Sequence, residues 1–189
     1  MSVSVGILLK RLLTPTPVVT AYALYKWRAR VSFRAEVELS QWLQLGRGTN
    51  VSSFTKIKAS SGPVKTGDRC GFGTGCFLGA GTGGIVMGNN VILGPNVSVI
   101  ASNYEYGRLD IPLEDQGHTS KGIRIGSNVW VGANSVLLDG TVLGNNTIVV
   151  AGSVVNRRFP ANCIIQGNPA KILLKRGGAT KPTSEVRHA

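Results

Sequence analysis

The sequence predicts an all-β fold in which the chain winds into a parallel β-helix of about five triangular coils. The first observation behind this prediction is a six-residue repeat of large apolar residues, Ile125, Val131, Leu137, Leu143, Val149 and Val155. Four residues after each of the first five stands a small or β-branched residue, namely Val129, Ser135, Thr141, Thr147 or Ser153. The second observation is a content of 25 glycines without the triplet period of collagen, which indicates many sharp corners.

The same register recurs upstream of Ile125. Residues six apart at the large inward position are Met87, Leu93 and Val99, then Thr66, Phe72 and Leu78, then Leu45, Val51 and Ile57; all but Thr66 are apolar. Cys70, Cys76 and Thr82 occupy the small position in the second of these groups. Three six-residue sides make a triangular coil that points one large and one small residue inward from each side. Coils stacked about 4.8 Å apart would hydrogen-bond to one another and bury a continuous apolar column.

The register also predicts how the chain is divided. Five coils are expected at 45–62, 66–83, 87–104, 125–142 and 143–160, which together form a β-helix over 45–160. Val99 and Ile125 are 26 residues apart, so residues 100–124 must project as a loop, and such loops often carry function. We expect an N-terminal helical cap over 1–44, a C-terminal cap over 161–176 and a polar, disordered tail over 177–189.

Composition limits the partners. The chain has 21 Lys and Arg against 9 Asp and Glu, a net charge of +12, which favours a polyanionic partner. No nucleic-acid motif accompanies the charge, so no nucleic-acid partner is expected. The apolar stretch 17–25 is bracketed by basic residues and is shorter than the ~20 residues that cross a bilayer. It either caps the domain or lies on an anionic membrane surface, and it does not resemble a signal peptide.

The three cysteines, Cys70, Cys76 and Cys163, lack the spacing of a zinc or redox motif. They are interpreted as small buried apolar residues in a reducing compartment, which favours a cytoplasmic protein. No metal site is expected, because neither histidine has a ligand partner at a recognisable spacing.

Three segments resemble one known family. They are Ile125-Gly-Ser-Asn-Val-Trp-Val-Gly-Ala-Asn, Val150-Ala-Gly-Ser-Val-Val and Gly167-Asn-Pro-Ala-Lys-Ile. Over residues 45–176 the chain resembles the hexapeptide-repeat O-acetyltransferases that act on galactosides, maltose and exopolysaccharides. Ile111-Pro-Leu-Glu-Asp-Gln-Gly before the last coils is similar to the polysaccharide-modifying branch. The resemblance implies a left-handed β-helix, a homotrimer, acetyl-coenzyme A bound between neighbouring prisms and a sugar hydroxyl as acceptor.

The resemblance also implies a coenzyme site. Ala133 and Ala151, eighteen residues apart, would stack and offer backbone groups to the pantetheine arm. The other implied residues are Trp130, Asn156, Arg157, Lys171 and either Lys175 or Arg176. Trp130 points outward and would line the cleft or a subunit contact, while the cations would meet the phosphates of the coenzyme. The alternative for the cations is that they are ordinary solvated charges near the chain end.

The histidine that serves the family as general base is missing, and Tyr104 stands at its position. A base contributes about 10²–10⁴-fold to such a reaction, and a phenol, which ionises near pH 10 in model peptides, is a poor one. The nearest replacement is His118, in the same loop; His188 is a weaker candidate. The loop carboxylates Glu105, Asp110, Glu114 and Asp115 are further alternatives, and each of these groups could equally be a solvated surface residue.

Three functions are compatible with these residues. The first is an active acetyl-coenzyme A-dependent O-acetyltransferase that uses His118, a loop carboxylate or a substrate-assisted route, with Tyr104 able to orient the acceptor. The second is a catalytically silent paralogue that binds coenzyme or a glycan as a non-catalytic subunit. The third is a scaffold of the same fold that binds no coenzyme.

Overall fold

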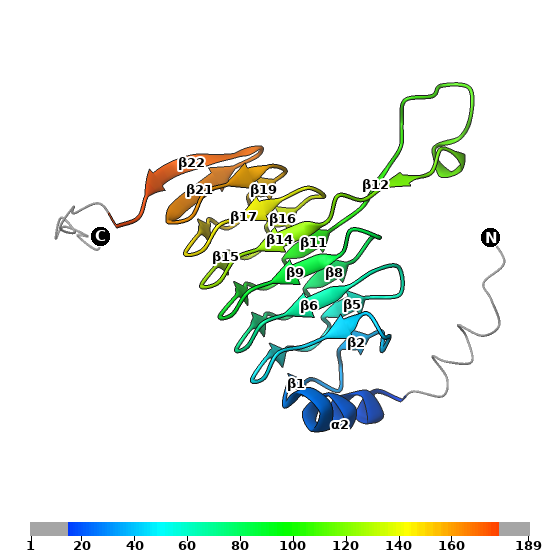
Figure 1. The fold of residues 1–189 in the computed structure, drawn as a ribbon, viewed down its shortest axis with the longest axis vertical. Helices are drawn as coiled ribbons and strands as arrows, with labels where there is room; N and C mark the ends of the chain where they lie inside the picture. The colour runs from blue at the N-terminus through cyan, green and yellow to red at the C-terminus, as the bar shows by residue number, and fades with distance from the viewer. Residues whose placement is uncertain (1–14, 178–189) are drawn as a thin grey trace, which may run out of the picture.

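The computed structural model describes residues 15–177, which form a stack of triangular coils with a helix at one end (Figure 1). The helix, α2 (Thr16–Trp27), begins directly after Pro15, and its C-cap residue Arg28 adopts a left-handed conformation with φ 52°. Val19 and Ala23, one helical turn apart, are the buried residues of α2. The helix therefore covers the open end of the first coil.

The strands form three long sheets, one on each face of the prism. The first face holds β1 (Arg30–Val31), β4 (Asn50–Val51), β7 (Gly71–Phe72), β10 (Ile92–Leu93), β15 (Trp130–Val131), β18 (Ile148–Val149), β21 (Cys163–Gly167) and β22 (Ala170–Lys175). The second holds β2 (Glu36–Val37), β5 (Lys56–Lys58), β8 (Phe77–Gly79), β11 (Ser98–Ile100), β16 (Val136–Leu137) and β19 (Val154–Val155). The third holds β3 (Leu43–Gln44), β6 (Val64–Thr66), β9 (Ile85–Met87), β14 (Ile123–Ile125), β17 (Val142–Leu143) and β20 (Arg158–Phe159).

Each face has one strand per coil, so the second and third faces, with six strands each, count six complete coils within residues 15–177. The structure thus has one coil more than the five expected. The extra coil is made by residues 30–44, which the sequence analysis included in the helical cap. All strand pairs of the coils are parallel; β22 alone on these faces runs antiparallel, folding back on β21 as the C-terminal cap.

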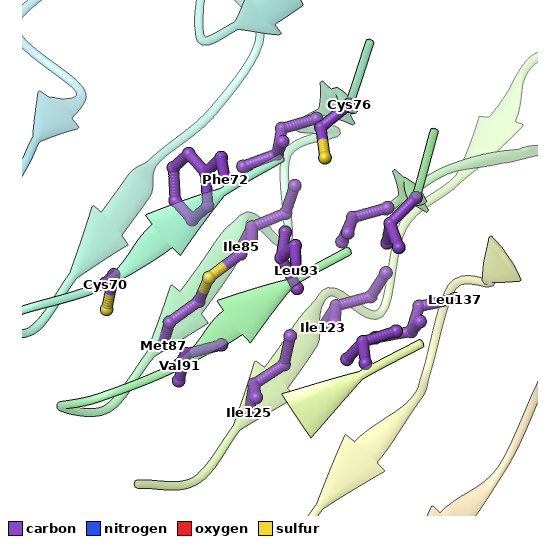
Figure 2. Packing of buried hydrophobic residues seen from close by; sticks show 14 of the residues in the cluster. Cys70, Phe72, Cys76, Ile85, Met87, Val91, Leu93, Ile123, Ile125 and Leu137 are labelled. Atoms are coloured by element: carbon purple, nitrogen blue, oxygen red, sulfur yellow. The ribbon is translucent and has the colours of Figure 1, made fainter. Parts of the chain in front are cut away.

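The predicted inward pattern is confirmed at every predicted position except Thr82. Large apolar side chains from all three faces meet in one core, of which Figure 2 shows the middle. The small positions are buried as well, including Val129, Ser135, Thr141, Thr147 and Ser153. Thr82 is an exception, because it lies exposed at a wider corner where Ala80 and Ile85 enter the core instead.

Asparagine turns the chain at many corners. Asn90, Asn128, Asn146 and Asn162 all have positive φ, between 56° and 59°, a region that asparagine tolerates better than most residues. These four corners lie above one another between the third and first faces. The side-chain amides of Asn128, Asn146 and Asn162 form a ladder in which each Nδ2 donates to the next Oδ1 at 2.8 Å. Asparagine therefore shares with glycine the role that the sequence analysis gave to glycine.

The cysteines lie where the sequence predicted them. Cys70, Cys76 and Cys163 are buried, unpaired and inside the prism. Burial raises the pKa of the Cys70 and Cys76 thiols, so these groups stay protonated and unreactive at neutral pH. In residues 15–177, no helix has the length and hydrophobicity needed to cross a bilayer.

Two neighbouring glycines provide a test of how tightly the coils stack. A Cβ on Gly73 would lie 2.7 Å from the backbone carbon of Gly94 and from the nitrogen of Pro95, whereas a Cβ on Gly71 would meet nothing within 4 Å. Gly73→Ala should therefore lower the free energy of unfolding by about 1–3 kcal/mol, because backbone must move to admit the methyl group. Gly71→Ala, two residues away in the same coil, is the matched control and should be neutral or slightly stabilising. Urea unfolding measures both; equal effects would contradict this stacking.

Candidate functional site

The projecting loop leaves the prism between the second and third faces and is itself folded. Its two arms pair as an antiparallel hairpin of β12 (Asn103–Tyr104) and β13 (His118–Thr119), extended by Glu105 N–H donating to Gly117 O at 3.0 Å. At the tip, the 3-10 helix η1 spans Leu113–Asp115. Gln116 closes the tip by donating to Arg108 O at 2.7 Å and accepting from Arg108 N–H at 3.0 Å. The loop stands well clear of the coils (Figure 1).

The hairpin brings together the two residues predicted to be catalytic. Tyr104 and His118 are direct partners in the antiparallel register, and their ring centroids are 4.3 Å apart with the planes inclined by 40°. Both side chains are exposed, Tyr104 at 48%. The imidazole of His118 therefore lies directly beside the side chain at position 104, with the two ring centroids 4.3 Å apart.

Two side chains attach the returning arm of the loop to coils on both sides of it. The Ser120 hydroxyl donates to Ala101 O at 2.5 Å and accepts from Gly83 N–H at 2.9 Å. Asp139, in the next coil, accepts from Lys121 N–H at 2.9 Å and from Gly122 N–H at 2.8 Å. Asp139 is only 8% exposed, so its carboxylate depends on these donors. The hairpin is therefore fixed to the prism at Ser120, only two residues after His118.

A hollow of about 390 Å³ opens at the base of the hairpin. Its walls come from both arms of the loop and from the corner of the following coil, and its lining is Asn103, Tyr104, Glu105, Tyr106, Gly107, Thr119, Lys121 and Asp139. Two aromatic rings, one cation and several hydrogen-bonding groups converge there. A lining of this kind suits a polar ring compound with hydroxyl groups.

The loop carboxylates do not gather around the hollow. Glu105 lines it, but Asp110 pairs with Arg108 at the exposed part of the loop, and this guanidinium lowers the pKa of the Asp110 carboxyl. Glu114 and Asp115 are exposed on η1. His188 lies outside the residues that the structure describes. Among residues 15–177, no group of three His, Cys, Asp or Glu side chains is arranged to hold a metal ion.

The predicted pantetheine residues lie at a different corner, between the first and second faces. Ala133 and Ala151 occupy this corner in successive coils, and Gly152 N–H donates to Ala133 O at 2.9 Å. Trp130 lies on β15, the strand that leads into the corner at Ala133, and the residue is 52% exposed. Its register partners on the neighbouring strands are Ile92 and Ile148. The corner and its flanking apolar stripe thus form a straight, shallow edge along the prism.

Three further predicted residues lie at the C-terminal end of the prism: Asn156 and Arg157 connect β19 on the second face to β20 on the third, and Lys171 lies on β22. The Arg157 guanidinium donates from Nη2 to Ala170 O at 2.8 Å and lies 5.4 Å from the ring centroid of Phe159. Lys171, the next residue along the chain, is exposed on β22, and Asn156 is exposed beside Arg157. The turn between β21 and β22 is tied back by Gly167 N–H, which donates to the Ser153 hydroxyl at 3.2 Å.

Arg176 lies elsewhere. Its guanidinium donates to Asn146 O at 2.8 Å, and its own N–H donates to Asn162 O at 2.7 Å. It therefore belongs to the asparagine ladder between the third and first faces. The structure brings Arg157 and Lys171 together, and it holds Arg176 at the far end of β22.

The two groups of predicted residues are separated within one chain. Ala133 precedes Asp139 by six residues, and only β16 between them is extended, so the two residues lie at most about 20 Å apart. The Tyr104–His118 pair and the Ala133–Ala151 edge consequently lie at two corners of the prism, with the second face between them.

Sequence reasoning missed Ser120, Lys121 and Asp139. Asp139 is the only acidic residue between Asp115 and Glu185, and it follows a run of apolar residues immediately before Gly140. An isolated acidic residue at a corner is a signal for a structural carboxylate, but which backbone groups it binds depends on where the loop returns.

The comparisons with known proteins agree with the fold. Residues 122–157 match the family model for the bacterial transferase hexapeptide (six repeats). The galactoside O-acetyltransferase of Escherichia coli is 31% identical over 90 residues, covering 47% of this chain and 43% of that protein. That of Lactococcus lactis is 33% identical over 92 residues, covering 48% and 43%. The chain spans about half the length of the curated relatives it matches.

A solved structure extends the likeness to most of the prism. AntD, an N-acyltransferase from Bacillus cereus in complex with dTDP and 3-hydroxybutyryl-CoA, superposes with a TM-score of 0.71 at 19% identity, covering 79% of this chain and 81% of AntD. Together with the matched repeats, this likeness confirms the predicted left-handed parallel β-helix and the predicted hexapeptide-repeat resemblance.

The carboxylate of Asp139 can be tested as the anchor of the hairpin. Asp139→Ala should leave the N–H groups of Lys121 and Gly122 without acceptors, at a cost of about 1–3 kcal/mol. Amide exchange should accelerate at both residues, and limited proteolysis should cut the loop sooner. Asp139→Asn keeps one acceptor oxygen, so its exchange and proteolysis rates should fall between those of the parent and those of Asp139→Ala. Unchanged exchange at Lys121 in Asp139→Ala would show that the hairpin is held by other contacts.

Proposed function

We propose that this protein, which carries the hexapeptide repeats of bacterial transferases, is an acetyl-coenzyme A-dependent O-acetyltransferase that acts on a hydroxyl of a sugar or polysaccharide precursor. The observation that carries the proposal is the pairing of His118 with Tyr104 at the base of the hairpin. The pairing supplies an imidazole beside position 104, where this chain has tyrosine and the similar acetyltransferases have their catalytic histidine.

In the proposed reaction His118 is the general base. The acceptor hydroxyl oxygen attacks the thioester carbonyl carbon while the neutral imidazole takes the hydroxyl proton. His118 then returns this proton to the departing sulfur as the C–S bond breaks, which yields the acetyl ester and the free thiol of the coenzyme. Tyr104 holds the imidazole plane and can donate its hydroxyl hydrogen to the acceptor.

The acceptor would lie in the hollow that Tyr104 lines; His118 is not one of the lining residues and would reach the acceptor hydroxyl past the Tyr104 ring, whose centroid is 4.3 Å from its own. Sugar rings stack on aromatic side chains through their C–H faces and hydrogen-bond through their hydroxyls, and Tyr104, Tyr106 and Asn103 offer both kinds of group. The named activities of the two galactoside O-acetyltransferases and the nucleotide bound by AntD support a sugar acceptor. Lys121 could balance a negative charge on such an acceptor.

Acetyl-coenzyme A, the acetyl donor, would lie along the edge formed by Ala133 and Ala151. The exposed indole of Trp130 would flank it, and the pair Arg157 and Lys171, with Asn156 beside them, would receive its phosphates. Arg176 is the less favourable phosphate ligand, since its guanidinium is held at Asn146, at the corner between the third and first faces and away from Ala133 and Ala151.

A homotrimer would bring the two halves of the site together. The edge at Ala133 and the hairpin at His118 lie at different corners of one chain, so a cleft between neighbouring copies can hold both. The exposed leucines of the loop, Leu109 at 100% and Leu113 at 55%, support a contact with a neighbour, because burying them against another copy would remove apolar surface from water. We also propose peripheral contact with an anionic membrane, for which the basic N-terminal part of the chain is suited, in a cytoplasmic protein.

The role of His118 is tested by its removal. His118→Ala should lower kcat by about 10²–10⁴-fold, whereas Tyr104→Phe should stay within about tenfold of the parent protein, because only His118 moves the proton. A double variant, Tyr104→His with His118→Ala, should recover part of the lost rate. An acceptor screen with acetyl-coenzyme A supplies the assay, and circular dichroism checks the fold of each variant. Full activity in His118→Ala would remove the residue from the mechanism.

Coenzyme binding is tested by calorimetry with acetyl-coenzyme A. Lys171→Ala should weaken binding about tenfold or more through the loss of a charge-assisted contact. Arg157→Ala should do the same and should also loosen the turn at Ala170. Arg158→Ala, at the neighbouring residue on the third face, is the control and should bind normally. Tight binding without turnover on any acceptor would identify a catalytically silent paralogue, and no binding at all would leave only a β-helical scaffold.

A further inference from the structure

Helix α2 is apolar on the side that faces away from the prism as well as on the side that faces it. Its inner side is formed by Val19 and Ala23, which are buried against the first coil. Its outer stripe consists of Pro17, Val18, Ala21, Leu24 and Tyr25, all of them exposed. Leu24 is 57% exposed and Tyr25 is 90% exposed. A helix that only covers a core has a polar outer side, so the outer stripe indicates a partner.

The charge around the outer stripe has a single sign. Residues 1–35 contain six Lys or Arg and no Asp or Glu. Four of the cations lie in the described part of the chain, where Lys26, Arg28, Arg30 and Arg34 are all exposed. Within residues 15–177, none of these four forms an ion pair with a carboxylate. This end of the prism is therefore strongly cationic.

The first acidic residues along the chain do not cancel this charge. Glu36 accepts from Lys58 at 2.6 Å and lies 3.5 Å from Lys56 Nζ. Glu38 lies 3.1 Å from the same Lys58 amine. Both carboxylates are thus balanced by lysines of the second coil, and the cations of residues 26–34 remain available for an anionic partner.

Aromatic residues border the stripe and the cations. Lys26 Nζ donates to the Tyr22 hydroxyl at 2.7 Å and lies 5.2 Å from the ring centroids of both Tyr22 and Trp27. Tyrosine and tryptophan beside lysine are typical of surfaces that sit at the level of lipid headgroups, since the rings are apolar and their polar tips remain hydrated.

We propose that the outer stripe of α2, with Lys26, Arg28, Arg30 and Arg34 around it, docks the protein onto an anionic lipid bilayer. This inference rests on the membrane contact of the proposed function and identifies the residues that make that contact. The apolar stripe enters the headgroup boundary, and the cations meet lipid phosphates. Because α2 lies across one end of the stack, the prism axis then points away from the membrane (Figure 1).

The surface suits a bilayer better than the other two possible occupants. A second copy of the same surface would place like charges against each other, which opposes association. The segment 1–14 carries two further cations, Lys10 and Arg11, and so adds to the same positive charge. In a trimer with parallel prisms, three copies of α2 would face the same side, and their combined avidity would raise a weak single contact.

The test is co-sedimentation of the full chain with vesicles. One set contains phosphatidylcholine with about a third phosphatidylglycerol and the other phosphatidylcholine alone. The protein should bind the anionic vesicles preferentially, and about 1 M NaCl, where the Debye length is about 3 Å, should weaken binding. The double variant Leu24→Gln with Tyr25→Gln should lower partitioning at least about tenfold, because two apolar anchors are lost.

A matched pair of single variants controls for general loss of hydrophobicity. Leu24→Gln and Leu173→Gln change side chains that are 57% and 58% exposed at opposite ends of the prism. Only Leu24→Gln should weaken vesicle binding. Equal binding by the double variant and the parent would overturn the proposal. A light-scattering mass for the parent that is twice the mass of the double variant would also overturn the proposal, since the stripe would then join two copies of the assembly.

Coenzyme calorimetry on the same proteins separates this inference from the proposed function. The double variant at Leu24 and Tyr25 should bind acetyl-coenzyme A as the parent does, because α2 is remote from the edge at Ala133. Vesicle binding without coenzyme binding would refute the acetyltransferase while the docking surface stands. Coenzyme binding without vesicle binding would refute the docking surface alone.

Discussion

Direct backbone contact between successive coils is the constraint on which the rest of this structure depends. Each coil donates its N–H groups to the carbonyls of the next, so the spacing of the coils is that of a sheet on all three faces. At corners such as Gly73, the backbones approach too closely for any side chain to lie between them. The interior is correspondingly narrow, which is why a small residue accompanies each large one on every side.

This constraint also decides where a functional loop can leave. Inside a coil, an inserted residue would shift every inward side chain to the outside, because side chains alternate along a strand. At a corner, an insertion leaves both neighbouring strands in register, and β11 and β14 indeed pair with the same neighbouring coils on either side of the loop. The loop is then fixed at its base by Ser120 and Asp139, so the rigidity of the prism is transmitted to His118.

The repeat made most of the fold predictable, and its failures have physical causes. Val31, Val37 and Leu43 are also six apart, but charged neighbours and the shift of register to Leu45 made residues 30–44 look like part of a cap. A strict count of six predicts Thr82 inward, but the corner there is wider and turns Thr82 outward. The pairing of Tyr104 with His118 could not be derived, since their contact depends on the register of a hairpin that no periodicity describes. The same holds for Arg176, whose position depends on how β22 folds back.

The geometry of the stack relates the proposed membrane surface to the proposed site. The hairpin leaves after β11, which is three coil steps from β2 on the second face, at about 4.8 Å per step. The hollow would then stand about 15 Å above the first coil, with the thickness of α2, about 10 Å, below it. An acceptor carried by a lipid would have to extend from the headgroups by roughly the sum of these two distances, about 25 Å, to reach His118. A stack that rises from the bilayer therefore selects acceptors by their reach, and the number of coils below the hairpin sets that reach.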